Sequence, residues 1–298
     1  MLKILKYLRY KHLLKNLIIF LPVFFDFENL NISQIKLLII AFIGFSLLTN
    51  AIYYLNDYTD FKIDKYNILK KKIILKKEYL LLTACFFFFL LLIYLYIFDY
   101  TFNRYIFLYL ANFLIYNYYL KKIFFADLII LSNFYIIRVL YGFAVYEELD
   151  LSILFLIFIY LFFFTLAICK RLIQIDVNLL RKTNNLIPYY KKNKPLLKIF
   201  ANITLSLSII IYSLFIFYSI TNTYIFENIF IQNKAFNKFS YSLITTLYAY
   251  LVFILHKVIN IRSPKKDIFE FIIKDKFTII LLLSIIIYHM NIILNLYA

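Results

Sequence analysis

Glycine is almost missing from this chain of 298 residues, which contains two Gly, four Pro and two Cys and lacks Trp. Two glycines exclude glycine-rich phosphate loops and the dinucleotide-binding fingerprint, which needs three glycines at close spacing. Cys85 and Cys169 lie in apolar runs and form no Cys-x-x-Cys pair or Cys/His cluster. A disulfide framework and a zinc site are therefore not supported, and we interpret both cysteines as small buried hydrophobic residues.

Charged residues are also scarce, at 16% of the chain, whereas 64% of the residues are hydrophobic and 21% are aromatic. A soluble globular chain is about 25% charged and roughly 45–50% apolar. Disordered chains lack the aromatic and aliphatic content found here. The composition therefore predicts an all-α, polytopic membrane protein.

Apolar runs that are long enough to span a bilayer recur along the chain. We predict nine transmembrane helices of about 20 residues, at 13–30, 34–55, 79–98, 105–121, 123–146, 151–169, 196–221, 240–257 and 277–297. Pro22 is expected to kink the first of them. Little chain remains outside the spans, so residues 1–298 are predicted to form a single transmembrane domain, with the basic residues 1–12 retained at the membrane interface.

The positive charge of the chain is distributed unevenly. Most of its 33 Lys and Arg residues lie within residues 1–15 or in the loops that follow the second, fourth, sixth and eighth predicted spans. Because cytoplasmic loops are enriched in Lys and Arg, the N-terminus is predicted to be cytoplasmic and the C-terminus external, in the cell membrane. The net charge of +17 then lies on one membrane face, where it attracts anionic lipid and can receive phosphorylated substrates. No nucleic-acid partner is expected, because the chain has no soluble basic module.

A group of acids interrupts these basic loops at the end of the second predicted span, where residues 56–64 read NDYTDFKID. At 100° per helical residue, Asn56, Asp57, Asp60 and Asp64 share an arc of about 100°. Stacked carboxylates repel one another unless a cation lies among them, and Mg²⁺ typically binds one or two carboxylates together with substrate phosphates. The pattern predicts a Mg²⁺–diphosphate site at the boundary between membrane and cytosol. The alternative is a solvated acidic helix end that offsets the neighbouring lysines.

The NDYTDFKID segment resembles the NDxxDxxxD motif of the UbiA superfamily of intramembrane prenyltransferases. Four further segments are similar to the decaprenyl-phosphate phosphoribosyltransferase branch of that superfamily. They are LRYKHLLKNLIIFLPVFF at 8–25, YNYYLKKIFFADLIILSNFYIIRVLYG at 116–142, LAICKR at 166–171 and SPKKDIFEFIIKDK at 263–276. The matching positions include Arg9, Lys15, Asn16, Pro22, Tyr116, Leu120, Lys121, Asp127, Arg138, Gly142, Lys170, Arg171, Ser263, Pro264 and Asp275.

The chain departs from the superfamily pattern after its sixth predicted span. Prenyl-diphosphate users of the superfamily carry a second DxxxD motif there, whereas Asp60 and Asp64 form the only such pair in this sequence. The region instead contains Lys170, Arg171, Gln174 and Asp176. The phosphoribosyl branch usually has an acid at the position of Gln174, so a second metal contact is not expected.

The resemblance implies that 5-phosphoribose is transferred from 5-phosphoribosyl 1-diphosphate to a polyprenyl phosphate, with Mg²⁺ on the departing diphosphate. It implies that Asp57, Asp60 and Asp64 are catalytic metal ligands and that Asn56 orients them. The implied substrate-binding residues are Lys15, Asn16, Lys121, Lys170, Arg171 and Arg138. For the lysines, the alternative is a side chain that extends to the membrane interface. The partners are then a polyprenyl lipid and a phosphorylated donor, and a homo-oligomer stays open.

Arg138 lies well inside the fifth predicted span. A charge there costs about 2.5–3.5 kcal/mol on insertion scales, so Arg138 is expected to face a polar cavity or a partner. Asp127 precedes it by 11 residues, or about 16 Å along a helix, so a direct pair between them is not expected.

Three other interpretations remain at this point. The first is a UbiA-type prenyltransferase that moves a prenyl chain from a prenyl diphosphate to an aromatic or glycerol-phosphate acceptor. The second is a membrane transporter or channel that uses the acids as an ion site. The third is an inactive homologue, since the chain departs from several family motifs.

Overall fold

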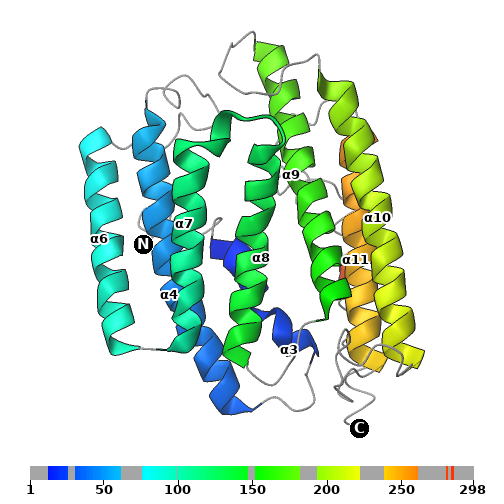
Figure 1. The fold of residues 1–298 in the computed structure, drawn as a ribbon, viewed down its shortest axis with the longest axis horizontal. Helices are drawn as coiled ribbons and strands as arrows, with labels where there is room; N and C mark the ends of the chain where they lie inside the picture. The colour runs from blue at the N-terminus through cyan, green and yellow to red at the C-terminus, as the bar shows by residue number, and fades with distance from the viewer. Residues whose placement is uncertain are drawn as a thin grey trace. The chain divides into compact units, whose positions relative to one another are not determined.

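The computed structural model describes a set of α- and 3-10 helices (Figure 1). The described residues are 13–25, 31–61, 76–98, 100–146, 152–181, 193–221, 238–260, 280 and 283–284. The chain divides into two compact units. Unit 1 comprises Met1–Pro22, Leu30–Lys121 and Ile137–Glu148, and unit 2 comprises Val23–Asn29, Lys122–Ile136 and Leu149–Ala298.

The helices of unit 1 come mainly from the first half of the chain. In chain order they are the 3-10 helix η1 (Leu14–Phe20), α4 (Ile32–Thr59), α6 (Lys77–Ile97), the 3-10 helix η3 (Thr101–Asn103), α7 (Arg104–Tyr118) and the start of η4 (Leu120–Lys122). The short helix α3 (Leu21–Phe25) begins in unit 1 and ends in unit 2. The helix α8 (Ala126–Tyr146) belongs to unit 2 in its first half and to unit 1 in its second half. Unit 2 also contains α9 (Ile153–Arg181), α10 (Lys194–Thr221) and α11 (Lys238–Asn260).

Five described helices are long and apolar enough to cross a bilayer. They are Ile32–Thr59, Lys77–Ile97, Ala126–Tyr146, Ile153–Asp176 and Lys194–Phe217, and they coincide with five of the nine predicted spans. The helix α7 contains 15 residues, and the apolar part of α11 is also short. The described part of the first predicted span consists of the short helices η1 and α3. The segment 1–12 and nearly all of the ninth predicted span lie outside the described residues.

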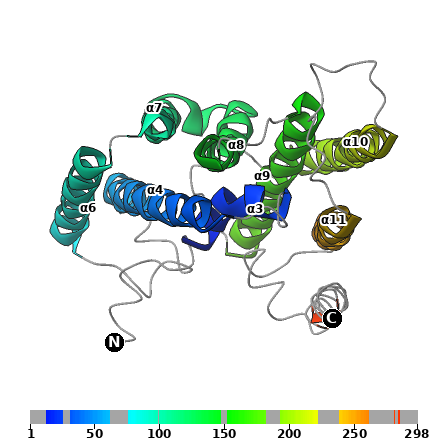
Figure 2. The same ribbon diagram turned by 90° about the horizontal axis from the view of Figure 1, so that it is seen from below.

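In unit 1, α4 packs against α6, α7 and η1. Figure 2 shows α7 nearly end-on, with α4 and α6 running obliquely to the view. A capping box starts α4: the Asn31 side chain accepts a hydrogen bond from the Ser33 N–H, and Gln34 accepts one from the Asn31 N–H. Such a box provides acceptors for backbone N–H groups that have no partner within the helix.

Both glycines of the chain lie where another element of unit 1 approaches a helix closely. A methyl group on Gly44 would overlap the Tyr94 ring of α6, and one on Gly142 would overlap the backbone carbonyl of Ile19 in η1. Any larger residue at Gly142 would therefore separate η1 from α8.

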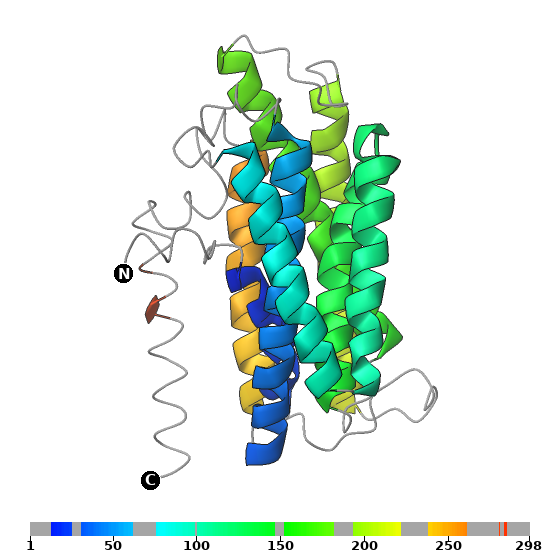
Figure 3. The ribbon, with the colours of Figure 1, turned by 90° about the vertical axis from the view of Figure 1, so that its left-hand side faces the viewer.

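In unit 2, α10 packs against both α9 and α11. Figure 3 gives a side view in which α10 is yellow-green and α11 is orange. Pairs of hydroxyl groups connect these helices: Thr165 to Thr204 at 2.7 Å, Ser208 to Tyr248 at 2.8 Å and Tyr212 to Thr245 at 2.8 Å. The three α10 members are spaced four residues apart, so they lie on one helical face. Within a bilayer, interhelical hydrogen bonds of this kind contribute to helix association.

The two cysteines differ from one another in exposure. Cys169 of α9 is buried, as the sequence predicts, whereas Cys85 of α6 is exposed. The expectation that Cys85 is buried is therefore wrong. Its apolar neighbours Phe86 and Phe89 are also exposed, which is common on a membrane helix because lipid solvates apolar side chains as well as protein does.

Candidate functional site

The C-terminal end of α4 carries two of the predicted metal ligands. Asp57 lies in the last turn and Asp60 is the C-cap residue. The last turn of α4 contains no basic residue. The partial negative charge at a helix C-terminus disfavours carboxylates there. A cation from elsewhere, either a side chain or a metal ion, would therefore stabilise the two acids.

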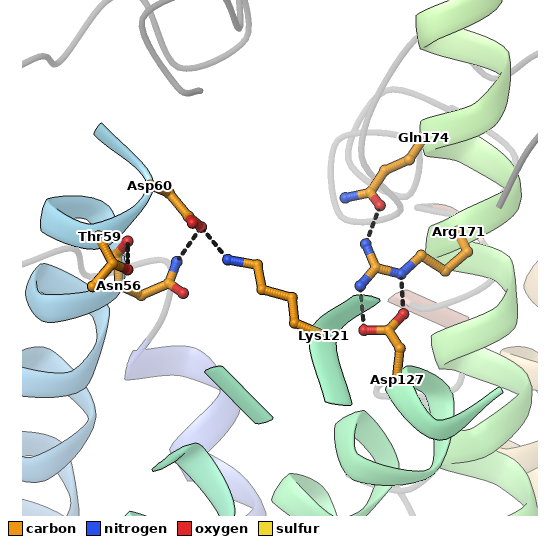
Figure 4. A network of polar contacts seen from close by, with 7 residues as sticks. All are labelled: Asn56, Thr59, Asp60, Lys121, Asp127, Arg171 and Gln174. Carbon is orange, nitrogen blue, oxygen red and sulfur yellow. Dashed lines mark hydrogen bonds and ion pairs between the residues drawn. The ribbon is translucent and has the colours of Figure 1, made fainter. Parts of the chain in front are cut away.

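Asp60 has two partners in unit 1 (Figure 4). The Asn56 side-chain amide donates a hydrogen bond to Asp60 Oδ2 at 3.2 Å, and the Lys121 ammonium forms an ion pair with the same oxygen at 2.5 Å. The Asp60 side chain is 18% exposed and that of Lys121 is 29% exposed. The Asn56 contact agrees with the predicted shared helical face. No local pattern indicates that Lys121, 61 positions later, is the counter-ion of Asp60.

A second polar network lies in unit 2, at the start of α8 (Figure 4). Arg171 of α9 donates two hydrogen bonds to the Asp127 carboxylate, from Nε at 2.6 Å and from Nη2 at 2.5 Å. A third, from Nη1, goes to the Gln174 side-chain oxygen at 2.5 Å. The Asp127 side chain is 0% exposed and that of Arg171 is 10% exposed. Arg171, predicted from the resemblance to bind substrate, is thus held by protein acceptors.

The backbone before Asp127 adopts an uncommon conformation. Phe125 has φ = 64°, the left-handed region that bulky residues rarely occupy. Its ring packs against Phe124 at 4.4 Å and Phe200 of α10 at 4.9 Å between centroids. These contacts offset a strain of about 1–3 kcal/mol. The turn places Asp127 in the first turn of α8, where the helix dipole favours a carboxylate.

A third network surrounds Arg138 in unit 1. Its Nε donates to Asn16 Oδ1 at 2.9 Å, and its Nη2 donates to the Tyr109 hydroxyl at 2.6 Å. The Asn16 amide in turn donates to Ser46 Oγ at 3.1 Å and Thr49 Oγ1 at 3.0 Å. Arg138 is 2% exposed, and its guanidinium lies 4.8 Å from the Tyr109 ring centroid. The prediction that Arg138 faces polar partners is confirmed, and these partners lie on η1 and α7.

The remaining predicted site residues are placed as follows. Lys15 on η1 and Lys170 on α9 are half-buried, as is Asp57. Asp64 lies outside the described residues, which stop at residue 61 and resume at residue 76. Within the described ranges, no three His, Cys, Asp or Glu side chains are grouped closely enough to hold a metal ion. The oxygen donors of Asn56, Asp57 and Asp60 are nevertheless the kind that Mg²⁺ prefers.

Residues 25–282 match the model of the UbiA prenyltransferase family. The chain belongs to this family. It is therefore a transferase embedded in a membrane, from a family that generally uses Mg²⁺. Its fold also resembles that of a solved structure reported as "Structural and mechanistic insights into the biosynthesis of Digeranylgeranylglyceryl phosphate synthase in membranes". That comparison has a TM-score of 0.57 and 14% sequence identity, and it covers 97% of each chain. No curated protein sequence matches this one.

Proposed function

We propose that this UbiA-family protein transfers 5-phosphoribose from 5-phosphoribosyl 1-diphosphate to a polyprenyl phosphate and releases diphosphate. The observation that carries the proposal is the polar network at the end of α9. Prenyl-diphosphate users carry a second acidic motif there, whereas this chain has Arg171 bound to Asp127 and Gln174. Asp176, the remaining acid, is paired with Lys194. Both described acids of this region, Asp127 and Asp176, are thus paired with basic side chains of the protein.

The reaction requires little acid–base chemistry from the protein. A phosphate oxygen of the lipid, already anionic, attacks the anomeric carbon of the ribose, and the bond from that carbon to the diphosphate oxygen breaks. The main requirement is to stabilise charge on the departing diphosphate. Bound Mg²⁺, held by Asp57, Asp60 and Asp64 with Asn56 orienting them, would supply much of that stabilisation.

Lys121 lies at the C-terminal end of α4, where it can stabilise negative charge on the diphosphate. The Lys121 side chain is partly exposed, and its ammonium group forms an ion pair with Asp60 Oδ2. In this proposal it turns to a phosphate oxygen when the donor binds, which leaves the Asp60 carboxylate to the metal ion. Lys15 and Lys170 are further proposed phosphate ligands. Asn16, Arg138 and Arg171, each hydrogen-bonded within its unit, are proposed to position the substrate-binding elements.

A second candidate is prenyl transfer from a prenyl diphosphate to an aromatic or glycerol-phosphate acceptor. The family match and the fold likeness to a digeranylgeranylglyceryl phosphate synthase structure favour it. Both candidates need the same diphosphate site on α4, so that site does not separate them.

Membranes containing the protein separate the two candidates directly. They are incubated with Mg²⁺, labelled phosphoribosyl diphosphate and polyprenyl phosphate, and in parallel with labelled prenyl diphosphate and 4-hydroxybenzoate or glycerol phosphate. Label in the lipid phosphate product of the first reaction, abolished by EDTA, supports the proposal. Product in the second reaction alone would replace it with prenyl transfer.

A further inference from the structure

Asn50 of α4 is a buried polar residue with an unmet acceptor. It is 4% exposed, and its side-chain oxygen Oδ1 has no hydrogen-bond partner in the part of the chain that the structure describes. Nearly all buried polar groups in native proteins are hydrogen-bonded, so a buried polar atom without a partner requires an explanation, of which a bound donor is one. The neighbouring side chain of Thr49, by contrast, both accepts from Asn16 and donates to the Ser46 carbonyl.

The position of Asn50 relates it to the proposed diphosphate site. It precedes Asp57 by seven residues, so the two side chains share one face of α4 and are separated by about 10.5 Å along the helix. Ser46 continues the same face one turn further and is bonded to Asn16. The face of α4 that begins at the acids is therefore polar for three turns.

The chemistry of the missing partner follows from the atom that needs it. A side-chain amide oxygen accepts a hydrogen bond from an N–H or O–H group. A prenyl chain offers neither, and would leave the oxygen buried in hydrocarbon. The ribose of a phosphoribosyl donor offers hydroxyl groups, and they are attached close to the diphosphate that the acids would hold.

We propose that Asn50 is a substrate-binding residue whose carboxamide oxygen accepts a hydrogen bond from a hydroxyl group of the sugar donor. The inference rests on the proposed function and extends it, because Asn50 becomes the residue that distinguishes a hydroxylated diphosphate from a prenyl diphosphate. The acids bind the diphosphate, which both donors contain, and Asn50 binds the sugar, which only the phosphoribosyl donor contains.

Binding measurements on the full-length protein in detergent or nanodiscs test this inference. Affinities for phosphoribosyl diphosphate and for inorganic diphosphate are measured with Mg²⁺ in the wild type, in Asn50→Leu and in Asn50→Ala. We expect both variants to bind phosphoribosyl diphosphate about 3- to 10-fold more weakly, the loss of one hydrogen bond, with unchanged affinity for inorganic diphosphate. The alanine variant removes the acceptor without adding bulk, so it still tests the inference if the leucine variant does not fold.

Tyr94→Phe is the matched control, because it also removes a buried polar atom from unit 1, on α6 beside Gly44. It should change neither affinity. Equal affinities of the wild type and the Asn50 variants for phosphoribosyl diphosphate, or an equal loss for both ligands, would overturn the inference. Such a result leaves the proposed function intact if wild-type membranes transfer phosphoribose. Failure of that transfer in the wild type would remove the proposed function, and the inference with it.

Discussion

Two aspartate–cation pairs, one in each unit, show how burial changes what an ion pair does. Asp60 and Lys121 in unit 1 meet through a single oxygen, and both side chains are partly exposed. Asp127 and Arg171 in unit 2 meet through two oxygens and are almost completely buried. An exposed single-contact pair contributes little stability and exchanges partners readily. A buried bidentate pair is costly to break, because the remaining charge has no water around it.

Residues that look equivalent in the sequence therefore have different roles. Lys121 and Arg171 are both basic residues next to family motifs, and the resemblance alone implies substrate binding for both. The Lys121 pair is a single contact and partly exposed, so we expect Lys121 to exchange partners, whereas Arg171 is held by acceptors of its own protein. Asp60 should therefore matter for catalysis, and Asp127 for stability.

Asp127→Asn is expected to have the largest effect on stability. It leaves the Arg171 guanidinium buried without its carboxylate, which costs about 3–5 kcal/mol. Thermal unfolding of the protein in detergent measures the loss. The double variant Asp127→Asn/Arg171→Gln should recover part of it, because no unpaired charge then remains. An Asp127→Asn protein as stable as the wild type would contradict the structural role of this pair.

Asp60→Asn should show the opposite profile. Removing the carboxylate takes away a proposed metal ligand, and we expect the transfer rate to fall about 100-fold or more. The melting temperature should stay close to that of the wild type, because the pair with Lys121 is partly exposed. Transfer assays in membranes, with the amount of inserted protein matched, measure the effect. Undiminished turnover would remove Asp60 from the site.

Gly142→Ala tests how much close helix packing stabilises unit 1. The Asp60–Lys121 pair of this unit is expected to contribute little stability. The added methyl group would overlap the Ile19 carbonyl, and overpacking of this kind costs about 1–3 kcal/mol. Gly44→Ala should cost less, because the Tyr94 ring can turn whereas a backbone carbonyl cannot. Unfolding midpoints of the two variants give the comparison, and a Gly44→Ala protein less stable than Gly142→Ala would reverse it.

Lys121→Gln should have the smallest effect on stability, within about 1 kcal/mol, because it removes one partner of an exposed pair. Its effect should appear in the KM for the phosphorylated donor, which we expect to rise more than kcat falls. The wild-type KM should also rise with salt, since exposed charges are screened. A Lys121→Gln enzyme with normal KM would show that Lys121 serves only Asp60.

The sequence predicted the helical class and five of the described spans because lipid imposes long apolar runs, and such runs are visible without any contact information. It also placed Asn56 and Asp60 on one face, since that depends only on helical periodicity. The short helices η1 and α3 were predicted as one span. Apolarity at 13–30 does not reveal that Asn16 binds Ser46, Thr49 and Arg138.

The partners of the charged residues could not be predicted from the sequence. Lys121 pairs with Asp60 across 61 positions and Arg171 with Asp127 across 44. Such pairings depend on how helices pack, which local patterns do not encode. Asn50 was overlooked for a related reason: a single Asn in an apolar run carries no motif, and its significance comes from the missing hydrogen-bond donor.

The order of elements around Arg138 has a consequence for biosynthesis. Ribosomes deliver η1, α4 and α7 to the membrane before α8, so the acceptors Asn16 and Tyr109 are made earlier than the guanidinium that they bind. A nascent helix with a central arginine thus meets polar groups already in the bilayer rather than bare lipid. Moving α8 to the front of the chain by circular permutation would remove that advantage, even with every native contact retained in the final fold.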